Sequence, residues 1–305
     1  MDYIQNLIVN HPKSNDNCED VDLILESGAA NGGYHIGCLS YIKALEQKNI
    51  VKVNRISGAS IGAVSGFYYL TNSLHEFLED YKKFRECFKK NLNVCVLKDI
   101  LNEKINKLTD DEFDSLNNKL HITFHDVEKR EQIMINTFAE KKDLLHSLLK
   151  SCHVPFFTQN SMFYIEDEKE FFDGGMPYIF PERTQTDNKL IYITVSQLDK
   201  LKCIFSIKKE LNPHERILEA ALDTHQFFLH NKKGKFCSII NDWEMKDFLK
   251  LRLKQLVFKI LFYNAVVCGY IIKKIYPVVS DFRIMHFFSP IVYNFYRDTL
   301  LFYCL

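Results

Sequence analysis

Apolar residues alternate between short continuous runs and helical stripes along the first 70 positions of the chain. The runs at 21–25 and 51–56 have the length and apolar content of buried strands. A glycine-rich turn follows each run. Apolar side chains at helical spacing come next, to about Lys48 and then over 61–70. Strand, helix, strand and helix at this spacing predict a parallel sheet covered by helices.

Residues 73–119 have a helical and strongly charged pattern, with Phe77, Leu78, Tyr81, Phe84 and Phe88 on one side. The first interpretation is a helix packed on the core, and the second is a cap with affinity for membranes. Further along the chain we expect strands at 121–124, 132–137, 190–195 and 203–207, a helix at 143–152, a hairpin from 162–165 and 170–172, and mostly helix from Pro213 onward.

This pattern divides the chain into three parts. Residues 1–20 end in a polar run, so they are expected to form a mobile N-terminal arm. Residues 21–200 carry the alternating strands and helices of the main α/β domain. Residues 201–305 are expected to be a mostly helical C-terminal extension, associated with a membrane in one interpretation.

The stretch 256–279 is the most apolar part of the extension. Its uncharged segment runs only from Lys259 to Lys273, whereas a bilayer span needs ~20 apolar residues. A core helix is therefore the first interpretation and an interfacial helix the second. A single-pass span comes last, because it would require Lys259 to snorkel.

Composition excludes some partners and compartments. Lysine plus arginine equals aspartate plus glutamate, 39 each, and no basic stripe occurs, so we expect no nucleic-acid partner. The nine cysteines are scattered and form no C-x-x-C pair, which predicts neither a metal site nor a disulfide framework. Reduced thiols and an N-terminus without a secretory signal favour an intracellular protein.

Glycine marks three special turns. Nine of the eleven glycines lie in three clusters, and the middle cluster reads Gly58-Ala59-Ser60-Ile61-Gly62. This G-x-S-x-G pattern lies between a strand and an apolar helix, the setting of a nucleophile elbow that projects Ser60. Glycine at 58 and 62 removes Cβ atoms from a sharp turn, and the helix N-terminus favours negative charge near the serine oxygen. The alternative is a plain serine N-cap.

The third glycine cluster offers a base for this serine. Asp173-Gly174-Gly175 follows the strand-like Phe171-Phe172. A serine hydroxyl is a poor nucleophile until a base accepts its proton. A carboxylate at this turn is expected to reach Ser60 directly, with no imidazole between them. Taken alone, Asp-Gly-Gly is an ordinary turn.

The first glycine cluster, from Ser27 to Gly33, follows a strand and opens a helix. Such loops direct main-chain N–H groups at an anion. One interpretation is an oxyanion hole formed by the amides of Gly28 and Ala29. The other is a dinucleotide-binding loop. A dinucleotide-binding loop would need the G-x-G-x-x-G spacing and an acidic residue at a strand end about 20 positions later, and this chain has neither.

Taken together, these segments resemble the patatin-like phospholipase family. Ser151-Cys152-His153-Val154-Pro155-Phe156-Phe157 is similar to the segment that precedes the aspartate motif in that family, and the likeness covers about residues 20–200. The resemblance implies a three-layer α/β/α fold with a mainly parallel central sheet. It also implies a Ser60–Asp173 dyad that hydrolyses acyl esters of phospholipids or glycerides at a membrane surface, with no metal or organic cofactor.

The first loop departs from the family pattern. The family usually has three glycines and then, one residue later, an arginine or lysine before another glycine. This chain has Ser27, Gly28 and Ala29, then Asn31 before Gly32. An alanine amide can still donate a hydrogen bond, so the oxyanion hole is retained in this interpretation. The missing cation leaves open a second one, a lipid-binding or membrane-associated protein of the same fold that turns over slowly or not at all.

A third alternative is an α/β-hydrolase with a Ser-His-Asp triad. Its histidine should follow the acid, and four histidines do so: His214, His225, His230 and His286.

Overall fold

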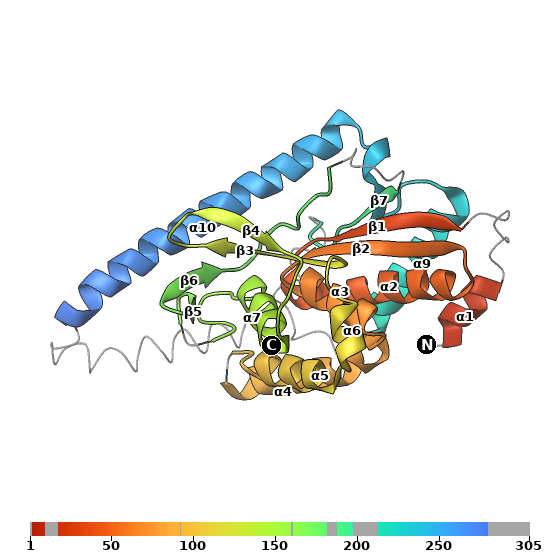
Figure 1. Cartoon of the computed structure of the whole chain (residues 1–305). Coiled ribbons are helices and arrows are strands. Elements are labelled where there is room, and N and C mark those ends of the chain that lie inside the picture. The colour runs from red at the N-terminus through yellow and green to blue at the C-terminus, as the bar shows by residue number, and fades with distance from the viewer. Residues whose placement is uncertain are drawn as a thin grey trace.

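The structure of the chain is a computed structural model that describes residues 2–9, 18–91, 93–159, 161–181, 188–197 and 213–279. Figure 1 shows one central sheet with most helices on one face and a single long helix across the other. The three-layer α/β/α fold expected from the sequence is therefore confirmed.

The sheet has eight described strands in the order β5-β6-β3-β2-β1-β7-β8, with β4 also paired to β3. Strands β3, β2, β1 and β7 run parallel, and the outer pairs are antiparallel. The strands are β1 (Glu19–Leu25), β2 (Val51–Ala59), β3 (Leu120–Asp126), β4 (Glu131–Ile135), β5 (Tyr164–Glu166), β6 (Lys169–Phe172), β7 (Lys189–Ile193) and β8 (Cys237–Ile239).

Apart from α1, the described helices agree with the apolar pattern in order and position. Helix α3 follows β2 without a loop, and α7 packs on β3. The helices are α1 (Asp2–Val9), α2 (Gly32–Gln47), α3 (Ile61–Leu70), α4 (Phe77–Asn91), α5 (Val96–Lys107), α6 (Asp110–Asp114), α7 (Lys141–Ser151), α9 (His214–His230) and α10 (Met245–Val279).

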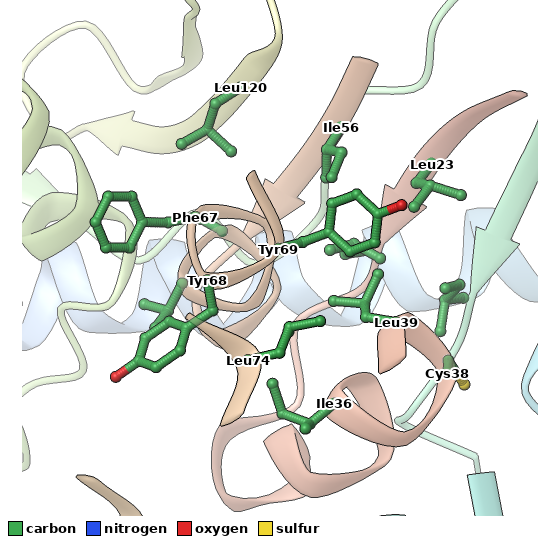
Figure 2. Close-up of a cluster of buried hydrophobic side chains, with 14 of the residues drawn as sticks. Leu23, Ile36, Cys38, Leu39, Ile56, Phe67, Tyr68, Tyr69, Leu74 and Leu120 are labelled. Carbon is green, nitrogen blue, oxygen red and sulfur yellow. The ribbon is translucent and has the colours of Figure 1, made fainter. Parts of the chain in front are cut away.

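Two apolar layers enclose the parallel strands because successive side chains point to opposite faces. Leu23 and Leu25 of β1 join the larger core with α2 and α3, and Figure 2 shows Leu23 there with Ile56 and Phe67. Ile24 joins the second core on the other face, which includes Leu251 of α10. A strand buried on both faces explains the continuous apolar run at 21–25.

The expected N-terminal arm is wrong over Asp2–Val9, which form α1. Ile4 and Ile8 are buried against the main core, 3% and 1% exposed, and α1 packs against α2. Two apolar residues at i and i+4 on one helical face provide the burial that holds the segment in place. Residues 10–17 of the expected arm lie outside the described residues.

The expected boundary at residue 200 does not separate two bodies in the described part of the chain. Strand β8 extends the same sheet by pairing with β7, and α9 packs against α2. The extension is helical in α9 and α10, as predicted. The expected strand at 203–207 and the aromatic-rich tail from residue 280 lie outside the described residues.

Helix α10 is not a core helix, so the first interpretation of 256–279 is wrong. Leu256, Ile260 and Val267 are 55%, 52% and 56% exposed, while other residues of α10 pack on the sheet. None of the described helices combines the length and apolarity that a bilayer span would need.

Candidate active site

Ser60 lies in a sharp turn between β2 and α3. Its backbone has φ 53° and ψ −127°, a conformation that is strained for a residue with a Cβ atom. Its carbonyl accepts the first hydrogen bonds of α3, from the amides of Ala63 (2.9 Å) and Val64 (3.2 Å). The turn thus presents the Ser60 side chain at the N-terminus of an apolar helix, as predicted for a nucleophile elbow.

The two glycines of this turn are required by close approach. A Cβ atom at Gly62 would lie 2.4 Å from the carbonyl oxygen of Leu25 in β1, and one at Gly58 would lie 2.4 Å from the nitrogen of Ala63. Both distances are shorter than real Cβ contacts, so any larger residue would displace the main chain. The physical reason given for the G-x-S-x-G spacing is confirmed.

Asp173 follows β6 in a second tight turn, which the main chain holds in place. The Asp173 amide donates to the carbonyl of His153 (3.1 Å), and the Gly175 amide donates to Oδ1 of Asp173 (2.7 Å). Gly175 has φ +63°, and a Cβ atom at Gly174 would lie 2.1 Å from the Thr123 carbonyl oxygen. The Asp-Gly-Gly sequence is therefore needed for this turn.

Ser151, at the end of α7, joins the two turns. Its Oγ accepts a hydrogen bond from the Ser60 amide (2.8 Å), and its carbonyl accepts one from the Gly174 amide (3.1 Å). Ser151 is fully buried. Sequence reasoning singled out 151–157 only by family likeness and gave Ser151 no task. The local signal in the sequence was a small polar residue at the end of an amphipathic helix.

The structure brings the Ser60 and Asp173 side chains together in a buried space, where they are 8% and 6% exposed. The Ser60 hydroxyl lies near enough to both the Asp173 carboxyl and the Cys152 thiol to lower the pKa of each. Oδ2 of Asp173 nevertheless has no hydrogen-bond partner of ordinary geometry among the described residues. The hydroxyl therefore lies between thiol and carboxylate, and catalytic hydrogen bonds often become shorter only when substrate binds.

Burial sets the charge of the Asp173 carboxyl group. Removal from water raises its pKa from 3.8 to about 7, although hydrogen bonds from Ser60 and from the Gly175 amide lower it. A carboxyl group with a pKa near neutrality can both accept and return a proton. Burial likewise raises the pKa of the Cys152 thiol, which is therefore uncharged near neutral pH.

The first glycine loop lies beside the elbow. Ala29 has φ 44°, and Ala29–Asn31 form a single helical turn closed by the Asn31 amide on the Gly28 carbonyl (2.9 Å). Among the described residues, no hydrogen bond of the Gly28 or Ala29 amide is found. Unpaired amides at a helix N-terminus are suited to binding an anion.

A cation reaches this loop from α9. The Arg216 guanidinium donates to the Ala30 carbonyl (3.0 Å) and to Oδ1 of Asn31 (2.9 Å), and its side chain is buried. Asn31 is also buried and donates to the Val195 carbonyl (2.8 Å). Sequence reasoning found the positive charge missing from position 31 and did not find Arg216, which is 185 positions away in the chain.

An apolar cavity of about 90 Å³ adjoins Ser60. Ala29, Ser60 and Cys152 line it, together with Phe77, Tyr81 and Phe84 of α4. The charged segment 73–119 thus packs on the core and also encloses the cavity. Such a lining suits a hydrocarbon chain next to the serine.

No described histidine is placed for a Ser-His-Asp triad. His225 bonds its Nδ1 to the Tyr41 hydroxyl (2.8 Å), and His214 and His230 lie at the two ends of α9. None of these three lines the cavity at Ser60. His286 lies outside the described residues. Within the described ranges, no cluster of three or more histidine, cysteine or acidic side chains could hold a metal ion.

Comparison with known proteins agrees with this geometry. The family model "Patatin-like phospholipase" matches residues 23–183, a stretch from β1 to beyond the Asp-Gly-Gly turn that covers more than half of the chain. No curated protein matches the chain at a significant level. Members of the matched family act on lipid substrates as acyl hydrolases. The elbow, the aspartate turn and the sheet between them fall inside the matched region, and the chain belongs to the patatin-like phospholipase family.

Proposed function

We propose that this protein hydrolyses fatty-acyl esters of membrane phospholipids or glycerides through a Ser60–Asp173 dyad. The observation that carries the proposal is the meeting of Ser60 with the buried carboxylate of Asp173, beside an apolar cavity. A buried acid with a pKa near 7 next to a strained serine is a pairing suited to nucleophilic catalysis.

In this mechanism Asp173 accepts the Ser60 proton as Oγ attacks the ester carbonyl carbon. The carbonyl oxygen becomes an alkoxide, which the Gly28 and Ala29 amides stabilise by hydrogen bonds. The proton passes from Asp173 to the departing alcohol or lysolipid, and an acyl-serine remains. Asp173 then takes a proton from water as the water oxygen attacks the acyl-serine. Asp173 returns this proton to Oγ of Ser60 as the bond from Oγ to the acyl carbon breaks, and the fatty acid leaves.

We assign Arg216 a positioning role. It holds the loop that carries Gly28 and Ala29 through the Ala30 carbonyl and the Asn31 side chain, and it brings a positive charge close to their amides. It thereby takes over the charge that the family pattern places at position 31.

The non-catalytic alternative is a lipid-binding protein of the same fold. It rests on the absence of a cation at position 31, where this chain has Asn31. The buried guanidinium of Arg216 at the same loop weakens that argument, because the charge is restored from another element.

Ser60→Ala should lower ester hydrolysis on the order of 10³-fold or more, because no other nucleophile replaces the hydroxyl. The readout is mass-spectrometric product analysis with mixed phospholipids and neutral glycerides, together with labelling by a fluorophosphonate. Ser40→Ala is the matched control, since the Ser40 hydroxyl is buried and has no hydrogen-bond partner among the described residues. A parent chain that is neither labelled nor active would favour the non-catalytic alternative.

The ionisation of the Asp173 carboxyl group should make both kcat/KM and the free energy of unfolding depend on pH. Its pKa in the folded chain is raised, so kcat/KM should rise with pH up to about 7 and then level off. The same shift lowers the free energy of unfolding as pH increases from about 4 to about 7, because the unfolded chain ionises first.

Asp173→Asn removes that ionisation. We expect the variant to be inactive and to gain stability relative to the parent, on the order of 2 kcal/mol more at pH 8 than at pH 5. Thermal unfolding at the two pH values measures the difference. If the difference in free energy of unfolding between variant and parent does not change with pH, the pKa of the Asp173 carboxyl group is not raised by burial.

Arg216→Ala should lower kcat/KM roughly 10- to 100-fold, since one donor of an oxyanion hole is worth ~10²–10³ and here the donors are only displaced. The double variant Asn31→Arg/Arg216→Ala returns the cation to the loop and should recover part of the loss. Circular dichroism reports whether each variant is folded. A folded Arg216→Ala variant with parental kcat/KM would remove Arg216 from the mechanism.

A further inference from the structure

Helix α10 is apolar on two opposite faces. Its inner face packs on the sheet, where Phe258 covers Gly175. The rings of Phe258 and Phe262 both pack on the His125 ring, with centroid distances of 5.2 Å and 4.9 Å. His125 in turn bonds the Asp173 carbonyl through Nδ1 (3.0 Å). The middle of α10 therefore lies directly on the turn that carries Asp173.

Two ion pairs fasten the inner side of α10 to the sheet. Nζ of Lys254 lies 2.6 Å from the buried carboxylate of Glu26, and Nζ of Lys273 lies 2.6 Å from Glu170. Burial alone would raise the pKa of Glu26, but Lys254 and neighbouring hydrogen bonds hold it below its ordinary value. The two ion pairs thus hold α10 at two points, and Figure 1 shows the helix lying across one face of the sheet.

The outer face of α10 carries an apolar stripe that no described residue covers. The spacing of its members, by three, four or seven positions, places them on one side of the helix. The stripe consists of Leu249, Leu253, Leu256, Ile260, Val267 and Ile271, which are 45–68% exposed. An exposed stripe of this extent is uncommon on a monomeric soluble protein and marks an interaction surface.

Positive charge borders the stripe. Helix α10 contains seven lysines and arginines and one aspartate, a net charge of +6 within a chain of net charge zero. Lys250 lies on one border of the stripe, and Arg252 and Lys259 lie on the other, by their helical positions. All three are exposed, and none forms an ion pair within 4.0 Å with a described acidic side chain, although Lys233 and, less strongly, Lys250 lower the pKa of Asp247. Apolar side chains between rows of cations match an anionic lipid surface, with the helix in the plane of the bilayer.

We infer that the outer face of α10 docks this protein on an anionic lipid bilayer. The apolar stripe of α10 enters the boundary between headgroups and acyl chains, and Lys250, Arg252 and Lys259 contact lipid phosphates and carboxylates. Two tyrosines with exposed rings, Tyr263 and Tyr270, add the amphipathic aromatic groups that favour this depth. The inference deepens the proposed function, because it names the surface on which the lipid substrate is met.

Vesicle flotation of the full chain tests the docking face separately from catalysis. The chain carries Ser60→Ala, so that lipid is not consumed, and is mixed either with phosphatidylcholine vesicles or with vesicles that also contain phosphatidylserine. We expect stronger binding to the second kind, and weaker binding at high salt because ions screen the charge attraction.

Two pairs of substitutions examine the two parts of the surface. Leu253→Ser/Leu256→Ser removes apolar side chains from the stripe, and Lys250→Gln/Arg252→Gln removes a cation from each border. Each pair should weaken binding to the phosphatidylserine vesicles roughly tenfold or more. The matched controls are Leu218→Ser/Leu222→Ser on the exposed side of α9 and Lys98→Gln/Lys142→Gln on α5 and α7, and these should bind as the parent does.

Several outcomes would overturn the inference. Equal binding to both kinds of vesicle, or α10 variants that bind as the parent does, would exclude this face as the anionic-lipid surface. A dimer in light scattering that Leu253→Ser/Leu256→Ser dissociates would assign the stripe to a second copy. A lower unfolding temperature with unchanged flotation would assign it to packing within the chain.

Hydrolysis of a short-chain soluble ester, measured in chains that retain Ser60, separates this inference from the proposed function. The α10 pairs should leave that rate unchanged. A parent that floats but hydrolyses no ester retains the docking face and loses the proposed function. A parent that hydrolyses the soluble ester but does not float loses the docking face alone.

Discussion

The candidate site depends on one buried residue, Ser151, that ties two turns together. The Ser60 turn belongs to β2 and α3, the Asp173 turn belongs to β6, and 113 positions of chain separate them. The Ser151 side chain accepts a hydrogen bond from the Ser60 amide, and the Ser151 carbonyl accepts one from the Gly174 amide. A single residue thus positions each turn relative to the other. Buried hydrogen bonds of this kind are costly to break, because the partner groups then lie unpaired away from water.

The same burial that orders the site makes it unfavourable for stability. Asp173 loses water and gains only a few hydrogen bonds, which raises its pKa to about 7. Ser60 adopts a positive φ that only the fixed surroundings of the turn can maintain. Each cost has a use in catalysis: the raised pKa makes Asp173 a proton acceptor near neutral pH, and the strained turn holds the Ser60 hydroxyl at a helix N-terminus beside the cavity. The two hydrophobic cores, one on each face of β1, supply the stability that offsets these costs.

Local patterns in the sequence predicted much of this arrangement. The buried run at β1 and the G-x-S-x-G turn follow from side-chain volume and main-chain approach within a few residues, so the sequence alone is enough to predict them. Arg216 could not be predicted in this way, because its role depends on α9 lying against α2 and not on any local motif. Helix α1 was missed because its two buried isoleucines are too few to outweigh the polar run that follows. The core interpretation of α10 failed because hydrophobicity alone does not say which face is covered.

The central claim is that Ser151 holds Ser60 and Asp173 in register, and the rate of Ser60 labelling by a fluorophosphonate tests it most directly. Ser151→Ala removes the acceptor for the Ser60 amide and keeps the carbonyl that Gly174 uses. A displacement of about 1 Å at a reacting group can cost on the order of 10²-fold, so labelling of a folded Ser151→Ala chain should slow by roughly that factor. Labelling at the parental rate would show that the two turns are aligned without Ser151 and would contradict the account.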